Sequence, residues 1–162
     1  MSKYPTQKLA VILQREAVES RWESHRWQLL DVIPDVGGAP RTILDSGKLR
    51  RRLFPGFEVT LFPDEAEGYF LNASSGEPSV FVSIRHDEAA DDRYPFQATL
   101  SYNEAARWMD GGEKVERTPA WPDLARWMGE WVEANYRPEP KKRRRPNSFE
   151  GKEGVLREKG SR

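Results

Sequence analysis

The chain has 162 residues, 37% hydrophobic and 32% charged, which predicts one globular domain with additional polar sequence. It contains no cysteine, which excludes disulfides, thiolate metal sites and a cysteine nucleophile. It also has no run of about 18 apolar residues, so no membrane-spanning helix is expected. Because residues 1–5 do not resemble a secretory signal, we expect the protein to be cytoplasmic.

The net charge of zero is the sum of two parts of the chain that carry opposite charges. Residues 137–162 contain ten Lys or Arg and four Glu, whereas residues 1–136 contain sixteen Lys or Arg and twenty-two Asp or Glu. The C-terminal part therefore carries +6 and the rest −6. We predict a single domain over residues 1–137 and a basic tail over 138–162. The tail is expected to be disordered when free, because it has too little apolar surface to offset its ordering entropy.

The first half of the chain predicts three strands separated by loops. The apolar run 8–13 predicts a buried strand, and residues 27–34 predict a second one that ends at Pro34. Residues 41–56 show little periodicity, so an extended or irregular connector is expected there. Apolar and polar residues then alternate over 57–61, which predicts a half-buried strand.

The middle of the chain alternates turns with short strands. The predicted strands are 69–72, 80–84 and 96–100, and the second is rich in β-branched and aromatic residues, as central strands are. The predicted turns and loops cover 62–68, 73–78 and the acidic stretch 85–94.

Two helices are predicted towards the C-terminal end. Ser101 and Glu104 have the spacing of a capping box, which predicts a helix over 102–110 closed by two glycines. Residues 114–118 predict an edge strand. The clearest amphipathic helix lies between Thr118 and Tyr136, and its apolar residues share one face: Trp121, Leu124, Trp127, Met128, Trp131 and Val132.

Together these elements predict an α+β fold. We expect an antiparallel sheet of five to seven strands, which could close into a barrel, joined by short turns. A short helix and the C-terminal amphipathic helix should follow it, with the latter packed on one sheet face. Three of the six tryptophans lie in that last helix, so it should cover the core.

The candidates for partner binding are aromatic and basic residues. Trp22 and Trp27 alternate with Arg21 and Arg26, so they could stack on a ligand or on each other. Packing of Trp27 in the core with Trp22 at the rim explains the pattern slightly better. Two basic clusters complete the set: Arg50, Arg51 and Arg52 in the body, and Lys141, Lys142, Arg143, Arg144 and Arg145 in the tail. The tail cluster could contact phosphates or an acidic protein surface, or serve only to keep the chain in solution.

No catalytic constellation, metal site or cofactor is expected. His25 and His86 have no neighbours at the spacing of a metal site or a Ser–His pair, which favours surface or strand-edge positions. Glu65 and Glu67 are expected on one strand face and could form a carboxylate pair for acid–base chemistry, although a turn explains them equally well. The acidic residues between 87 and 92 could attract a hard cation, but a solvated loop is the preferred interpretation.

Four segments follow one another in a characteristic order. They are the opening strand with Trp22, Arg26, Trp27 and the run to Pro34; Glu65–Asn72 with Glu77–Arg85; Thr99–Ala106 with Asp110–Pro119; and the tryptophan helix with Lys141–Arg145. This order resembles a small bacterial family without established function whose members are commonly encoded beside molybdenum-dependent formate dehydrogenases. The resemblance covers most of residues 8–145 and implies an accessory or maturation role for a molybdopterin enzyme. The chain lacks the glycine-rich phosphate loops of nucleotidyl transferases.

We therefore expect a non-enzymatic accessory or adaptor protein that binds a partner protein. The resemblance implies that this partner belongs to a molybdopterin formate dehydrogenase system. One alternative is nucleic-acid binding through the basic tail, which the negative charge of the body opposes. The other is a small-molecule or molybdenum-cofactor-handling enzyme, which would need a pocket with converging polar groups.

Overall fold

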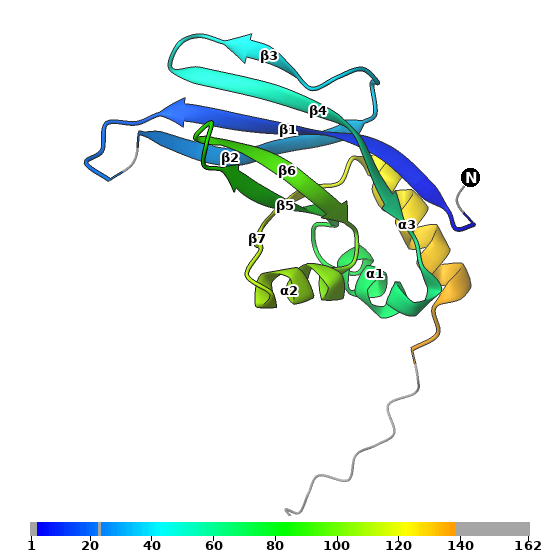
Figure 1. Cartoon of the computed structure of the whole chain (residues 1–162). Helices are drawn as coiled ribbons and strands as arrows, with labels where there is room; N and C mark the ends of the chain where they lie inside the picture. Colours follow the sequence, from blue (N-terminus) through cyan, green and yellow to red (C-terminus); the bar gives the residue numbers. More distant parts are fainter. Residues whose placement is uncertain (1–2, 23, 139–162) are drawn as a thin grey trace, which may run out of the picture.

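A computed structural model describes residues 3–22 and 24–138, and it shows seven strands and three α-helices (Figure 1). The strands are β1 (Thr6–Ala17), β2 (His25–Pro34), β3 (Arg41–Asp45), β4 (Leu49–Thr60), β5 (Ser79–Asp87), β6 (Asp92–Thr99) and β7 (Lys114–Pro119). The helices are α1 (Ala66–Ala73), which follows a 3-10 turn at Pro63–Glu65, α2 (Tyr102–Asp110) and α3 (Pro122–Asn135).

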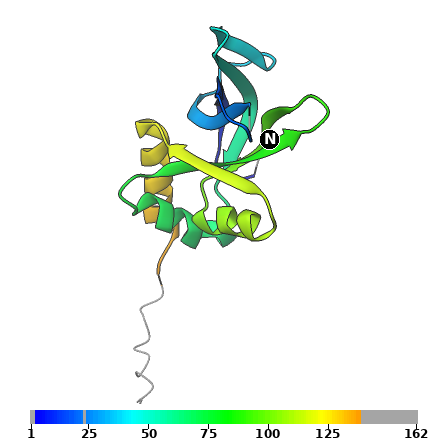
Figure 2. The same ribbon diagram turned by 90° about the vertical axis from the view of Figure 1, so that its left-hand side faces the viewer.

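The strands form two antiparallel sheets rather than one. The larger sheet has the order β2-β1-β4-β3 and the smaller one β6-β5-β7. Contacts of β2 with β7 and of β4 with β6 bring the two sheets together. The three helices gather at one end of the molecule, and the turns that join β1 to β2, β3 to β4 and β5 to β6 lie towards the other (Figures 1 and 2). The predicted α+β class is confirmed. The prediction of a single sheet is wrong, and the described strands do not close into a barrel.

The core lies between the inner faces of the two sheets and one face of α3. Strands β1 and β5 contribute alternate residues to it, as the period of two requires. Its buried apolar residues include those of β1 (Leu9, Val11, Leu13), β5 (Val80, Val82, Ile84) and α3 (Leu124, Met128, Val132), with further ones from β2 and β4. The strand β3 is exposed throughout and contributes none. On the outer face of the larger sheet, Ala10, Ile12 and Leu53 form a second small cluster. Burial on both faces explains why residues 8–13 read as a continuous apolar run.

The C-terminal helix agrees with the prediction. Its buried residues recur at steps of four, and Trp121, Trp127 and Trp131 are partly buried against the core. The ring of Trp131 meets that of Tyr69 edge to face at 5.5 Å between centroids. Pro122 occupies the first turn, where its missing N–H is not needed. None of the helices in the described part of the chain has the length and hydropathy needed to span a bilayer.

The expected irregular connector at residues 41–56 is wrong, because β3 and most of β4 lie there. The strand β4 is the partner of both β1 and β3, so it is an interior strand of the larger sheet. The sequence of β4 does not indicate an interior strand, because Pro55 and Gly56 lie within it. They lie where the register with β1 shifts, and Gly56 has a φ of 89°. A bulge of this kind is one of the few places where a strand accepts proline and glycine.

The strand predicted at residues 69–72 is also wrong, because these residues belong to α1. The helix buries Ala66, Tyr69 and Asn72, which are three residues apart and so share one face. The buried Asn72 amide fixes this helix: its Nδ2 donates to the carbonyl oxygens of Ser79 (2.7 Å) and Leu100 (2.9 Å), and its Oδ1 accepts the N–H of Ser79 (2.9 Å). The residues Tyr-Phe-Leu favour a strand locally, and these long-range contacts override that preference.

The second half otherwise follows the predicted order. The helix at 102–110, the central position of β5 and the edge position of β7 are confirmed. The hydroxyl of Ser101 accepts the N–H of Glu104 at 3.0 Å, as in a capping box. The Glu104 carboxylate, however, accepts a hydrogen bond from Thr99 instead of reaching back to Ser101. The loop predicted at 85–94 is shorter than expected, because β5 and β6 extend to Asp87 and from Asp92 as a hairpin.

Candidate functional site

A row of aromatic and basic side chains crosses the larger sheet at the end away from the helices. Arg15 on β1 is paired with Trp27 on β2 and with Arg50 on β4, so the three side chains share one face. Their guanidinium carbons lie 5.9 Å (Arg15) and 5.8 Å (Arg50) from the Trp27 ring centroid. These distances are within the range of cation–π attraction. Trp27 is half-buried, so it forms a fixed wall rather than a mobile surface residue.

The three consecutive arginines of β4 do not act as one cluster. Arg50 Nη2 lies 2.7 Å from the Asp92 carboxylate of β6, and this ion pair, with side-chain exposures of 16% and 27%, links the two sheets. Arg51 points to the opposite face, where its Nε donates to Gln14 at 2.8 Å. Arg52 lies over the ring of Phe54 at 5.5 Å. Successive residues of a strand alternate between faces, and this separates the predicted basic cluster.

Next to Trp27, two adjacent hollows open between the ends of the two sheets. Both are lined by His25, Trp27 and Arg93. The first, about 190 Å³, is also lined by Arg26, Ile84, Lys114 and Glu116. The second, about 260 Å³, is also lined by Trp22, Ser24, His86 and Asp91. We call these residues together the basic cleft.

Cations outnumber carboxylates in the basic cleft, with Arg26, Arg93 and Lys114 against Glu116 and Asp91. In the part of the chain that the structure describes, the Arg93 guanidinium and the Lys114 ammonium have no hydrogen bond or ion pair. Arg26 has only a distant, exposed contact with Glu16 at 3.9 Å. The Glu116 carboxylate is already engaged, since it accepts the backbone N–H of Leu29 at 3.1 Å. The cleft thus presents positive charge on a body whose total charge is negative.

Both histidines lie in the second hollow, which the sequence did not indicate. His25 Nδ1 is 3.1 Å from the Ser24 hydroxyl, and His86 Nε2 is 3.0 Å from the Asp91 carboxylate. The hydroxyl and the carboxylate contact different imidazoles, so neither histidine is placed between a hydroxyl and a carboxylate as in a catalytic triad. Among the described residues, no group of three or more His, Asp or Glu could hold a metal ion.

Trp22 is the most exposed large hydrophobic side chain in the described part of the molecule. It is 87% exposed and lines the mouth of the second hollow. The exposed position of Trp22 agrees with the rim placement, whereas Trp27 is half-buried at the cleft and is not part of either core cluster. An exposed indole beside arginines is typical of protein-binding surfaces, where Trp and Arg contribute much of the binding energy.

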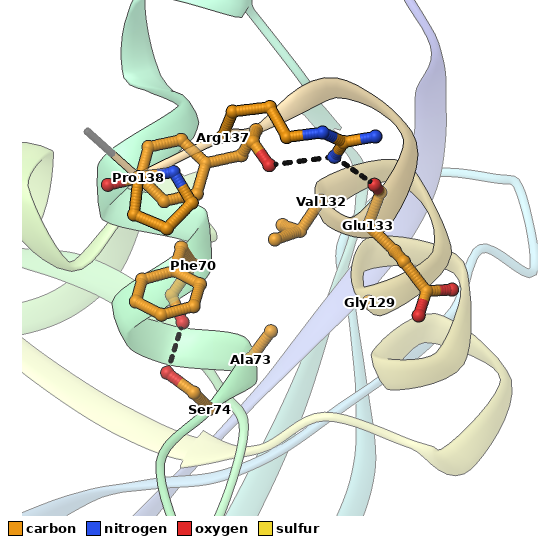
Figure 3. A pocket seen from close by; sticks show the side chains of 9 residues that line it. Phe70, Ala73, Ser74, Gly129, Val132, Glu133, Arg137 and Pro138 are labelled. Carbon is orange, nitrogen blue, oxygen red and sulfur yellow. Dashed lines mark hydrogen bonds between the residues drawn. The ribbon is translucent and has the colours of Figure 1, made fainter. Parts of the chain in front are cut away.

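A separate apolar groove lies at the helical end, between α1 and α3 (Figure 3). The groove has a volume of about 430 Å³. The rings of Phe70 and Tyr136 form part of its wall, with 5.0 Å between their centroids. Arg137 Nη1 donates to the carbonyl oxygens of Glu133 (2.6 Å) and Tyr136 (3.1 Å), which caps the end of α3. The described chain ends in this groove at Pro138, far from the start of β2 (Figure 1).

The carboxylate pair expected on a strand at Glu65 and Glu67 does not form, because these residues lie at the start of α1. The Glu65 carboxylate accepts the Ser101 hydroxyl at 2.5 Å and also binds the Arg107 guanidinium. This contact raises the pKa of Arg107 above its usual value. Glu67 accepts the side-chain amide of Asn103 at 3.1 Å. Each carboxylate therefore joins α1 to α2, which is a structural role.

The comparisons with known proteins give a family but no activity. A family model described as a protein of unknown function, DUF3305, matches residues 8–145. The chain belongs to this family. Neither the curated proteins nor the solved structures that were searched gave a match. The DUF3305 range spans all three helices and six of the seven strands, together with all but the first two residues of β1.

The structure of this DUF3305 protein brings some predicted site residues together and separates others. Trp22, Arg26 and Trp27 line the basic cleft, Arg50 supports Trp27 from behind, and Arg51 and Arg52 lie elsewhere. The predicted cluster Lys141–Arg145 lies outside the described residues. Sequence analysis missed Arg93 and Lys114, which lie on the smaller sheet and reach the cleft only through the packing of the two sheets.

Proposed function

We propose that this DUF3305 protein is a non-enzymatic accessory or adaptor protein that binds a partner protein through its basic cleft. The observation that carries the proposal is the position of Trp22, which is 87% exposed in a cleft where Arg93 and Lys114 have no ion pair among the described residues. An indole that is exposed to water adds nothing to the stability of the folded domain. A partner that covers the Trp22 indole removes a large apolar area from solvent. Trp27 and Arg50 support the surface rigidly from behind, which limits the entropy lost on binding.

We further propose that the partner is a subunit of a cytoplasmic molybdopterin formate dehydrogenase system in a bacterium. The support is the resemblance of the four ordered segments to a family commonly encoded beside such enzymes. The basic run Lys141–Arg145 is proposed to assist by attracting an acidic surface of the same partner. In this role the tail would increase the rate of encounter, and the cleft would select the partner.

The proposal is tested by co-purification from a host that naturally contains the protein. The tagged full chain is used as bait, with Trp22→Ala as the variant and Met109→Ala, a 52% exposed apolar residue on α2, as the matched control. We expect mass spectrometry to recover an oxidoreductase subunit with the wild type and the control, and much less of it with Trp22→Ala. Recovery of nuclease-sensitive nucleic acid in place of a protein would favour the alternative, and equal recovery with Trp22→Ala would contradict the proposal.

A further inference from the structure

We propose that the basic cleft recognises a short acidic segment of its partner, with carboxylate side chains entering the two hollows and an apolar side chain covering Trp22. The inference rests on the proposed partner-binding function and adds the chemistry of what is bound. It concerns residues of both sheets, of which Arg93 and Lys114 are the least neutralised.

The size of the hollows fits side chains better than a whole cofactor. Their volumes, about 190 and 260 Å³, lie below the range of roughly 300–1,000 Å³ that is usual for small-molecule pockets. The hollows are adjacent and share His25, Trp27 and Arg93 as a common wall. Two side chains of one extended segment can therefore enter them on either side of this wall, with Arg93 facing both.

The charges favour carboxylates. A guanidinium such as that of Arg93 offers paired N–H donors that match the two oxygens of a carboxylate, and the ammonium of Lys114 adds a point charge. Two carboxylates also line the hollows: that of Glu116 accepts the Leu29 N–H, and that of Asp91 lies 3.0 Å from His86 Nε2. Their negative charges limit the number of anionic groups that the cleft can accept, which suits one or two acidic side chains more than a string of phosphates.

Three observations disfavour nucleic acid as the occupant. The guanidinium groups of Arg15 and Arg50 already lie over the Trp27 ring at 5.9 and 5.8 Å, so a base would have to compete with them for this ring. Among the described tryptophans that line the cleft, Trp22 alone is largely exposed, whereas single strands are bound by successive aromatic platforms. In addition, the charge of −6 on residues 1–136 repels a polyanion at long range.

Titration of the full chain with capped hexaglutamate, followed by the NMR signals of the tryptophan indole N–H groups, tests the inference. These signals separate binding in the cleft from binding to the basic tail, which the same peptide can also contact. Hexaglutamine and a six-nucleotide oligothymidylate serve as the uncharged and the phosphate probes. The variants are Arg93→Glu with Lys114→Glu, and the matched control is Arg126→Glu, an exposed residue of α3 that is paired with Asp123.

We expect hexaglutamate to shift the Trp22 and Trp27 signals but not those of Trp121 and Trp131. Reversal of both cleft charges should weaken this binding about tenfold or more, because attraction is replaced by repulsion, and Arg126→Glu should leave it unchanged. Shifts that are absent from Trp22 and Trp27, or equal shifts with hexaglutamine, would overturn the inference. Tighter binding of the oligothymidylate in the cleft would also overturn it. If the co-purification still depends on Trp22 in those cases, the partner-binding function stands with a different recognition chemistry.

Discussion

Tyr69 shows how a single side chain connects distant parts of this fold. It is 1% exposed, its hydroxyl donates to the carbonyl oxygen of Thr60 at 2.9 Å, and it accepts the N–H of Phe62 at 3.1 Å. Its ring also packs edge to face on Trp131. The residue therefore ties the end of β4, the start of α1 and α3 together. Burial of the phenol raises its pKa to about 12, because the buried site disfavours the phenolate.

The raised pKa of Tyr69 predicts a loss of stability at alkaline pH. The unfolded chain releases this proton near pH 10 and the folded chain near 12, so the folded state holds more protons between these values. The contribution of the Tyr69 phenol to the free energy of unfolding is complete below about pH 10. It falls as the pH rises, by at most about 1.4 kcal/mol per pH unit. Urea unfolding of the wild type and of Tyr69→Phe between about pH 9 and 11 measures this pH-dependent contribution. We expect the stability advantage of the wild type to shrink with pH, and a constant advantage would contradict this assignment.

At the scale of elements, the contact between α1 and α2 depends on a glycine. Gly68 is buried on α1, and a Cβ atom placed there would lie 2.1 Å from the Ser101 hydroxyl oxygen. Ser101 cannot easily move away, because its hydroxyl binds Glu65 and also caps α2. The glycine thus allows the two helices to approach closely.

Substitution of this glycine should therefore have the opposite effect from substitution of a glycine on α3. We expect Gly68→Ala to lower the free energy of unfolding by about 1–3 kcal/mol, because the added methyl group overpacks a buried contact. At Gly129 a Cβ would meet no atom within 4 Å, so Gly129→Ala should raise stability by about 0.5–1 kcal/mol through helix propensity. Urea denaturation of both variants measures the difference. Similar effects of the same sign would show that the α1–α2 contact is not tight.

The elements that sequence analysis predicted correctly are those whose residues follow one clear period. The buried face of α3 repeats every three or four residues, and the cap of α2 is a local signal. The strand β4 was missed because its bulge contains Pro55 and Gly56, which normally end a strand. The helix α1 was missed because its residues have strand propensity, and the contacts of Asn72 that stabilise it come from positions 7 and 28 residues away.

At the scale of the whole molecule, the candidate site could be predicted only where its residues are neighbours in sequence. Trp22, Arg26 and Trp27 lie within one short segment, so their alternation was visible. His86 and Arg93 belong to the other sheet, and only the packing of the two sheets brings them to this segment. The three arginines of β4 looked like one surface because the connector was not recognised as a strand.

The basic cleft and the end of the described chain lie in different parts of the molecule. The basic cleft lies at the end of the sheets, whereas the described chain ends at Pro138 beside the apolar groove, at the helical end (Figure 1). We therefore propose that the cleft selects the partner and that the basic run at 141–145 only accelerates the encounter.

The most direct test is the binding kinetics of the co-purified partner with two variants of the full chain. One carries Trp22→Ala and Arg93→Glu in the cleft, and the other replaces Lys141–Arg145 with glutamine. We predict that the cleft variant binds about 30-fold more weakly or worse, as expected for loss of an interface hot spot. The tail variant should associate more slowly and depend less on salt while its dissociation rate stays unchanged. Loss of binding in the tail variant together with normal binding in the cleft variant would contradict the account.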